Sequence, residues 1–383
     1  MNNKMKVKRY NYQQQFGDDI DRLMGDLRSM LLNGSYILTE ELASFEREFA
    51  RFVGVAHACG TNTGTDAITL ALMALGLGLG DEIITQANTF NATVAAIRIT
   101  GATPVLVDAD ENSFQMNATQ VGAAITSRTK ALLPAHLYGK PAPMAKLLAI
   151  ADRWRLAVVE DAAQAHGARL DGRMVGSFGT AGCFSFHPSK NLAAAGDAGA
   201  VATSDAQLAE QIALMRCLGQ RNQNEHLVAG INSKMDAIQA RVLSWKLSCL
   251  EDWNAQRRRV AASYRERLAG LPLRFQSEDP NEEHVYHLFQ VRTDSRDALL
   301  AHLQQSGVDA IVRYPTPIHL QPAFSDMGWR KGQFPVAEKL AAELLCLPIR
   351  PDLSLSEVDY VSECVHVFFK GQQHRSVAAV AMQ

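Results

Sequence analysis

The sequence lacks the features that mark secreted, membrane-spanning and metal-binding proteins. Its six cysteines are far apart in 383 residues and form no CxxC or Cys/His spacing, so we expect free thiols, with neither disulfides nor a metal site. No apolar run is long enough to span a bilayer, and the basic N-terminus has no apolar signal-peptide core. We therefore predict a soluble cytoplasmic protein.

Charge of either sign is not in excess. Lys and Arg number 38 and Asp and Glu number 40, and no long basic run occurs. The short cluster QRRRV at residues 256–260 lies in a helical pattern and is predicted to be a solvated helix face. We expect no DNA or RNA partner.

The order of apolar segments predicts an α/β fold. Strand-like and helix-like segments alternate from about residue 55 to 250, and apolar runs such as VLV, ALL and AVV are continuous, as in parallel strands buried on both faces. No GxGxxG follows the first predicted strand, which argues against a dinucleotide-dependent oxidoreductase. The pattern predicts a doubly wound α/β domain with a mostly parallel sheet.

The pattern changes after residue 250, where one long helix precedes short strands and a final helix. A chain of this length exceeds the usual size of a single hydrophobic core. We predict a large α/β domain over residues 13–250, a smaller α+β domain over residues 251–370 and a flexible tail over residues 371–383.

Three stretches lie where loops follow predicted strands, at the sheet edge where α/β proteins bind ligands. In TNTGTDAI, Gly64 allows close backbone approach and Thr65 offers an N–H and a hydroxyl before a helix, which indicates a phosphate site. An ordinary helix N-cap explains the same residues. In VVEDAAQAHG, Asp161 can hold a protonated ring nitrogen of a cofactor or cap the next helix.

The third stretch, CFSFHPSKNL, places Lys190 just after a buried aromatic strand. Desolvation lowers the pKa of an amine and makes it a nucleophile, so Lys190 fits a Schiff-base lysine. A lysine that extends its charged end to solvent at a strand end is the alternative. Together, the three stretches predict a site for pyridoxal 5'-phosphate.

The motifs GTNTGTDAI, ANTF, VVEDAAQAHGA, SFHPSKNL, GDAGAV, NSKMDAIQA and YPTPIHLQPAF resemble, in order and spacing, those of the DegT/DnrJ/EryC1/StrS sugar aminotransferases. The resemblance covers about residues 30–350. It implies a fold-type I subunit like aspartate aminotransferase, and a homodimer whose active sites use residues of both chains. It also implies Lys190 as the catalytic lysine that binds the cofactor.

The resemblance assigns further contacts to positions of this sequence. The implied cofactor ligands are Asp161 at the ring nitrogen, Gln164 near the ring, Phe90 stacked on it, Gly64, Thr65 and Ser185 at the phosphate, and Asn232 from the neighbouring subunit. His187, Arg313 and His319 are candidates for contacting substrate. For Arg313 and His319 a structural role is the alternative.

Three positions depart from the family pattern: His187 stands where a tyrosine is frequent, Lys234 where an arginine is common and Ala198 where glycine is frequent. They bear on substrate choice rather than on the cofactor. Some relatives carry histidine at the catalytic position and catalyse dehydration, so the presence of Lys190 favours transamination.

The resemblance implies transfer of an amino group from L-glutamate to a keto sugar, with a nucleotide-linked keto-deoxyhexose as the expected acceptor. A ketone without a nucleotide, on a free sugar or cyclitol, is the alternative because no nucleotide-binding motif is legible. A regulatory protein that binds the cofactor without turnover is a further alternative.

Overall fold

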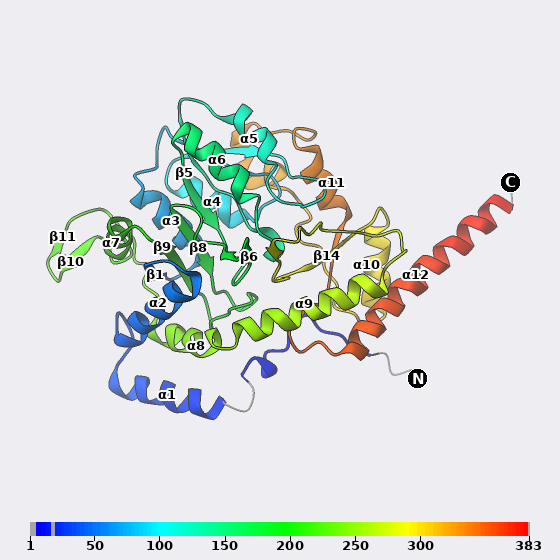
Figure 1. Ribbon diagram of the computed structural model, residues 1–383, viewed down its shortest axis with the longest axis horizontal. Helices are drawn as coiled ribbons and strands as arrows, with labels where there is room; N and C mark the ends of the chain where they lie inside the picture. Colours follow the sequence, from blue (N-terminus) through cyan, green and yellow to red (C-terminus); the bar gives the residue numbers. More distant parts are fainter. Residues whose placement is uncertain (1–4, 17–19, 382–383) are drawn as a thin grey trace.

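The computed structural model describes residues 5–16 and 20–381, which form twelve α-helices and fifteen strands (Figure 1). The helices are α1 (Ile20–Asn33), α2 (Glu40–Val53), α3 (Gly64–Ala74), α4 (Asn91–Ile99), α5 (Ala118–Ala124), α6 (Met144–Trp154), α7 (Ala206–Met215), α8 (Ala237–Leu247), α9 (Leu250–Arg267), α10 (Arg296–Gln305), α11 (Pro335–Glu343) and α12 (Leu355–Ala381). Short 3-10 turns are η1 (Gln13–Gln15), η3 (Leu137–Gly139), η4 (Ile318–Leu320) and η5 (Pro322–Met327).

The strands build one large sheet and three small ones. They are β1 (His57–Thr61), β2 (Glu82–Gln86), β3 (Thr103–Val107), β4 (Thr129–Leu132), β5 (Ala157–Asp161), β6 (Arg169–Leu170), β7 (Arg173–Met174), β8 (Ala181–Ser185), β9 (Gly199–Thr203), β10 (Gln220–Asn222), β11 (Glu225–His226), β12 (Arg274–Phe275), β13 (Glu282–Glu283), β14 (Phe289–Arg292) and β15 (Leu344–Leu347). The seven-stranded sheet has the order β1-β9-β8-β5-β4-β2-β3.

The large sheet is mostly parallel, as predicted, because only β9 runs against its neighbours β1 and β8. Adjacent residues of one strand enter different cores. Ile83 of β2 and Val159 of β5 pack with α3, α4 and α7, whereas Ile84 and Val158 pack with α5 and α6. Both faces of these strands are therefore covered by helices, which explains why their apolar runs are continuous.

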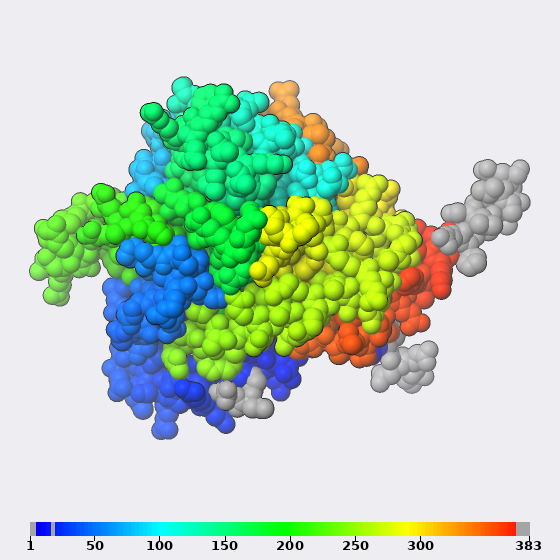
Figure 2. Space-filling model, viewed as in Figure 1, coloured from blue at the N-terminus to red at the C-terminus, as the bar shows by residue number. Residues whose placement is uncertain are grey.

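A second core lies in the C-terminal part, where α9, α10 and α12 pack around β14 and β15. Val7 of the N-terminal segment is fully buried in this core and pairs with Val308. Figure 2 shows the dark-blue N-terminal segment beneath α9, beside the start of α12. The C-terminal part is thus an α+β unit with its own core.

Helix α9 corrects one expectation about surface charge. The cluster at residues 256–260 was predicted to be a solvated face, but Arg257 is buried, Arg258 is half-buried and Arg259 is exposed. Arg257 donates through one terminal nitrogen to the carbonyls of Tyr286 (3.1 Å) and Ile349 (3.2 Å), so it joins α9 to the C-terminal core.

The end of the chain is helical. Helix α12 continues through Gly371 to Ala381, and the flexible tail over residues 371–383 stays a prediction (Figure 1). Residues 382–383 of that predicted tail lie outside the described residues. The expected boundaries at residues 13, 250 and 370 stay predictions.

Helices long and apolar enough to cross a bilayer are absent from residues 5–16 and 20–381. The six cysteines are free thiols, as expected, and four of them are buried.

Candidate active site

A cavity of about 510 Å³ opens at the ends of the central strands, where β5 and β8 lead into their loops. Most of the predicted site residues line it, although they come from distant parts of the sequence. They are Gly64, Thr65, Phe90, Asp161, Gln164, Ser185, His187, Lys190 and Arg313. The two exceptions are Asn232 and His319.

Lys190 lies in the loop that follows β8, and its backbone N–H donates to the carbonyl of His187 at 2.8 Å. The next side chain is fixed: the Asn191 amide donates to Asn254 Oδ1 (3.1 Å) and to the carbonyl of Val285 (3.0 Å). Burial lowers the pKa of Lys190 to about 8, the positive charge of Arg313 adds to this, and Asp161 opposes it. A lysine with this pKa has about a tenth of its amine unprotonated at pH 7, far more than an ordinary lysine.

Asp161 ends β5 with its carboxylate toward the cavity. Its Oδ2 accepts a hydrogen bond from Thr93 Oγ1 at 2.6 Å, and its Oδ1 accepts the N–H of Ala163 at 3.2 Å. Thr93 comes from α4, which covers the same face of the sheet as Val159, two residues before Asp161. A strand alternates its faces, so this placement follows from the position of Asp161 in β5.

Glu160 points to the opposite face and is completely buried. Its carboxylate pairs with His136 Nε2 at 2.9 Å and accepts the backbone N–H groups of Gly176 and Gly179, both at 2.7 Å. His136 Nδ1 accepts the N–H of Ala142, so the ring proton is on Nε2, which donates a hydrogen bond to Glu160. Of the two adjacent carboxylates, Glu160 is therefore bound within the protein, and Asp161 is the one available to a ligand.

The start of α3 supplies the donors of the predicted phosphate site. Its N-cap is Thr63, whose Oγ1 accepts the N–H of Asp66 at 3.0 Å, so the helix begins at Gly64, one residue before the predicted opening at Thr65. A Cβ on Gly64 would lie 2.5 Å from Cβ of Ser185, and one on Gly199 would lie 2.3 Å from the carbonyl oxygen of Thr63. Glycine at both positions lets β8, β9 and this helix start converge.

Gln164 and Phe90 are joined by a residue that the sequence analysis missed. Gln164 Oε1 accepts the N–H of Tyr138 at 2.7 Å, and its amide donates to the hydroxyl of Tyr314 at 2.9 Å. The rings of Tyr314 and Phe90 lie 5.1 Å apart, and Phe90 is 44% exposed beside the cavity. Tyr314 stood within the quoted stretch YPTPIHLQPAF, but nothing in that stretch singled it out.

The three candidate substrate residues differ in position. Arg313 and His187 line the cavity, and His187 Nδ1 contacts Ser189 Oγ at 2.9 Å. His319 lies outside it, buried in η4 with its Nε2 2.9 Å from Glu338. The expected contact of His319 with substrate therefore has no support in this chain's geometry, and the structural alternative fits it.

Asn232 lies outside the cavity of its own chain and is exposed. The adjacent Ser233 is buried, accepts the N–H of Asn62 at 3.1 Å and donates to Asp66 at 2.8 Å. The segment that carries Asn232 is therefore fixed against the beginning of α3, and Asn232 itself is exposed.

Other lining residues gave no signal in the sequence. Tyr10 and Tyr12 of the N-terminal segment line the cavity with their rings stacked, 5.7 Å between centroids. His287 lines it too, and burial, followed by the charge of Lys190, lowers its pKa well below the usual value. His166 lies behind the lining, packed between Phe184 and Phe186. Burial and the charge of Lys190 lower its pKa to about 3, so both imidazoles are neutral.

The fold and the cavity define a class: an α/β protein with a low-pKa lysine, a buried carboxylate and a helix N-terminus around one ligand site. Clusters of three or more metal-ligating side chains are absent from residues 5–16 and 20–381. The chain belongs to the DegT/DnrJ/EryC1/StrS aminotransferase family, whose sequence pattern matches residues 18–366.

Similar proteins agree with that assignment. The chain is 45% identical over 339 residues to the dTDP-3-amino-3,4,6-trideoxy-alpha-D-glucose transaminase of Streptomyces venezuelae, covering 87% of this chain and 89% of that protein. It superposes with a TM-score of 0.92 on the structure of S. venezuelae DesV in complex with a ketimine intermediate. The two share 42% sequence identity, and the match covers 94% of this chain and 97% of DesV. NtdA of Bacillus subtilis, solved with bound cofactor PMP, gives a TM-score of 0.90 at 31% identity, and the match covers 96% of this chain and 86% of NtdA. This chain is accordingly an aminotransferase of fold type I.

Proposed function

We propose that this protein transfers an amino group from L-glutamate to the keto group of a nucleotide-linked sugar, using pyridoxal phosphate. The observation that carries the proposal is the meeting of Lys190, Asp161 and the start of α3 in one cavity. Similarity to a dTDP-sugar transaminase supports a nucleotide-linked acceptor. A ketone without a nucleotide is the alternative acceptor.

The donors and acceptors of the cavity fit pyridoxal phosphate. The N–H groups at the beginning of α3 and the Ser185 hydroxyl suit a phosphate dianion, since a helix N-terminus favours negative charge. The Asp161 carboxylate suits a protonated ring nitrogen, and the exposed face of Phe90 suits a flat ring. When bound, the cofactor supplies a ring that takes up the electron pair released at the donor's α-carbon.

Lys190 would hold the cofactor aldehyde and then carry the proton. A base near neutral pKa can remove a proton from one carbon and return it to another, and the lowered pKa of Lys190 meets that requirement. Asp161 would keep the ring nitrogen charged throughout. Its bond from Thr93 holds the carboxylate in place, and because that donor is neutral the negative charge remains available.

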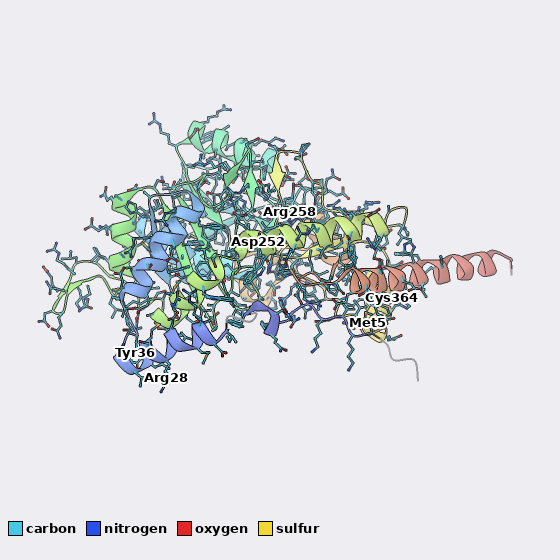
Figure 3. All side chains as sticks on the ribbon, turned by 60° about the horizontal axis from the view of Figure 1, so that its bottom comes forward. Met5, Arg28, Tyr36, Asp252, Arg258 and Cys364 are labelled. Carbon is cyan, nitrogen blue, oxygen red and sulfur yellow. The ribbon has the colours of Figure 1, made fainter. Side chains whose placement is uncertain are left out.

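We propose also that the enzyme is a cytoplasmic homodimer in which Asn232 completes the partner's site. Asn232 is exposed and does not line its own cavity, and it lies on a segment fixed by Ser233. Apolar side chains of α1 are exposed, among them Met24 (53%), Leu31 (52%) and Leu32 (77%), as expected of a surface that a second subunit covers. Arg28 and Tyr36 mark this region in Figure 3.

The test is the visible absorption spectrum of the purified protein with pyridoxal phosphate, before and after L-glutamate. We expect a band from the lysine-bound cofactor that glutamate removes and that an oxo acid restores. A panel of keto sugars with and without a nucleotide then separates the two acceptor classes. A protein that shows no such band would refute the cofactor, and a band that glutamate leaves unchanged would refute the donor.

A further inference from the structure

The N-terminal segment, residues 5–16, lines the catalytic cavity through Tyr10 and Tyr12, but the proposed transamination gives neither residue a role. Met5, labelled in Figure 3, begins this segment, and its helical part is the short turn η1. A segment with so little secondary structure keeps one position only where other parts of the protein hold it.

The first half of the segment is fixed to the C-terminal core. Val7 is fully buried there, and its carbonyl accepts the N–H of Asp309 at 2.9 Å. Four residues further on, Asn11 Nδ2 donates to Asp352 Oδ2 at 2.7 Å. These two attachments lie on either side of Tyr10 in the sequence, so its backbone has little freedom to move.

The second half is fixed to α8, which packs with β8 and β9 of the large sheet. Gln15 Oε1 accepts a hydrogen bond from Lys246 Nζ at 3.0 Å, and the ring of Phe16 stacks on Trp245 with 6.1 Å between centroids. The segment therefore joins the two cores, with both of its cavity-lining tyrosines between the two attachments.

The ring of Tyr10 is held by neighbours in its own segment. Tyr12 stacks on it, with 5.7 Å between centroids and 11° between the planes. The guanidinium carbon of Arg9 lies 5.4 Å from the centre of the Tyr10 ring, and Arg9 is itself paired with Asp309 at 3.0 Å. Stacking and the cation over the ring therefore restrict the orientation of Tyr10.

A second cavity, of about 650 Å³, is lined by the N-terminal segment, by α9 and by residues 350–355. Several of its lining residues are exposed, among them Gln14, Arg259 and Leu355. Solvent therefore reaches this cavity, and any active-site residue that borders it is close to water.

Tyr10 and Lys190 are the two residues, within the part of the chain that the structure describes, that line both cavities. Tyr12 lines the catalytic cavity alone. A side chain that borders two cavities lies at the boundary between them. The Tyr10 ring is thus placed beside Lys190 at the point where the solvent of the second cavity comes nearest to it.

We propose that Tyr10 is a wall that shields Lys190 from the water of the second cavity, and that the N-terminal segment is the strap that holds this wall in place. The inference rests on the proposed function only for the role of Lys190. An amine kept from water loses its proton more easily, and a closed site prevents side reactions with water. Tyr10 would act through Lys190 and take no part in the proton transfer itself.

The test acetylates the full-length, cofactor-free protein with acetic anhydride at one pH and follows each lysine by peptide mass spectrometry. Lys246 is the internal reference, because its pKa is also lowered to about 8 and its neighbours Gln15 and Phe16 belong to the same segment. We expect Tyr10→Ala to acetylate Lys190 about tenfold faster, since the amine no longer waits for a local opening. The rate at Lys246 should stay within about twofold of the wild type, as for a change that leaves the segment attached.

Two further variants isolate the ring of Tyr10. Tyr10→Phe keeps the ring, so Lys190 should react as in the wild type. Tyr12→Ala is the matched control, because it removes a ring of the same segment that lines the catalytic cavity alone, and Lys190 should react at most about twofold faster.

Three results would overturn the proposal. The first is an equal rate at Lys190 in Tyr10→Ala and the wild type. The second is a parallel rise at Lys246, because the variant would then release the whole segment rather than remove a wall. The third is an equal rise at Lys190 in Tyr12→Ala, because the ring that borders both cavities would then have no special effect.

The L-glutamate half-reaction separates this proposal from the proposed function. A visible band that glutamate removes, together with equal acetylation of Lys190 in Tyr10→Ala and the wild type, refutes the wall and leaves the aminotransferase in place. A band that glutamate does not change, together with the expected contrast between Lys190 and Lys246, refutes the proposed function and leaves the wall in place.

Discussion

Two regions of the molecule lower the pKa of a lysine to about 8, and only one of these lysines lines the candidate active site. Lys190 faces a cavity with Asp161 and Arg313. Lys246 of α8 is buried against the N-terminal segment, where it donates to Gln15 Oε1 at 3.0 Å and lies 4.4 Å from the ring centre of Phe16.

Desolvation acts on both lysines, so a low pKa does not by itself distinguish Lys190, the proposed catalytic lysine, from Lys246. Burial is the whole cause of the low pKa at Lys246, whereas at Lys190 nearby charges of both signs modify it. What distinguishes Lys190 is space for a ligand and a carboxylate across that space.

The largest effect is expected from Lys190→Ala. Removing the proton carrier should slow the glutamate half-reaction by at least about 10³-fold, at the upper end of general acid–base contributions. Lys246→Met, which removes the other low-pKa amine, should leave that rate within about threefold, a bound set by the small effects of changes away from the chemistry. Stopped-flow absorbance with L-glutamate measures both, and a large loss in Lys246→Met would break the comparison.

The second-largest effect on the half-reaction is expected from Asp161→Asn. The amide keeps its shape and can still accept from Thr93, but it has no negative charge for the ring nitrogen. The half-reaction should slow by about 10²-fold, the scale of a lost electrostatic contact at a reacting group. The matched variant is Glu160→Gln, which should lower the melting temperature instead, because Glu160 binds His136 and two backbone N–H groups in the interior.

These contrasts also show how far the sequence could predict the site. Lys190 and Asp161 lie in short motifs at strand ends, so their position after predicted strands was enough to single them out, whereas Gln164 was assigned through the family resemblance. Thr93 and Tyr314 were not found, because each acts through a partner distant in sequence: Thr93 is 68 residues from Asp161, and Tyr314 is 150 residues from Gln164.

The fold was predictable to a similar depth. Continuous apolar runs predicted the parallel sheet, whereas the antiparallel β9 had no signal of its own. The contact of Val7 with the C-terminal core also needed the tertiary structure, because it joins residues about three hundred positions apart. Likewise, the polar pattern of residues 256–260 did not reveal that Arg257 turns inward toward two carbonyls.

The third prediction concerns stability against pH. The folded-state pKa of Lys246 is lower than its unfolded value, so the unfolded chain binds more protons between about pH 8 and 10.5. Through this group the free energy of unfolding should therefore rise as the pH increases across that window. Lys246→Met should remove this contribution and stabilise the protein at pH 7 by on the order of 1–3 kcal/mol.

Denaturant unfolding of the wild type and Lys246→Met at pH 7 and pH 10 checks this prediction. The two stability curves should converge as the pH rises. Curves that stay parallel would show that Lys246 is charged equally in both states, and the burial argument for it would then be wrong.

The smallest effect compares two helix N-caps, one inside the site and one outside. Thr63 caps α3, and Asp205 caps α7 by accepting the N–H groups of Gln207 and Leu208. Either Thr63→Ala or Asp205→Ala should cost about 1 kcal/mol of stability, the usual value of a lost cap.

The two caps should differ in cofactor affinity. Thr63 lines the cavity, so Thr63→Ala should also weaken pyridoxal phosphate binding by a few-fold, whereas Asp205→Ala should not. Thr63→Ser keeps the capping oxygen and should restore both properties. Fluorescence titration of the cofactor-free protein measures the affinity. If the two alanine variants bind the cofactor equally well, the Thr63 side chain contributes a cap but no ligand contact, and the phosphate site must depend on Ser185 and the N–H groups at the beginning of α3 alone.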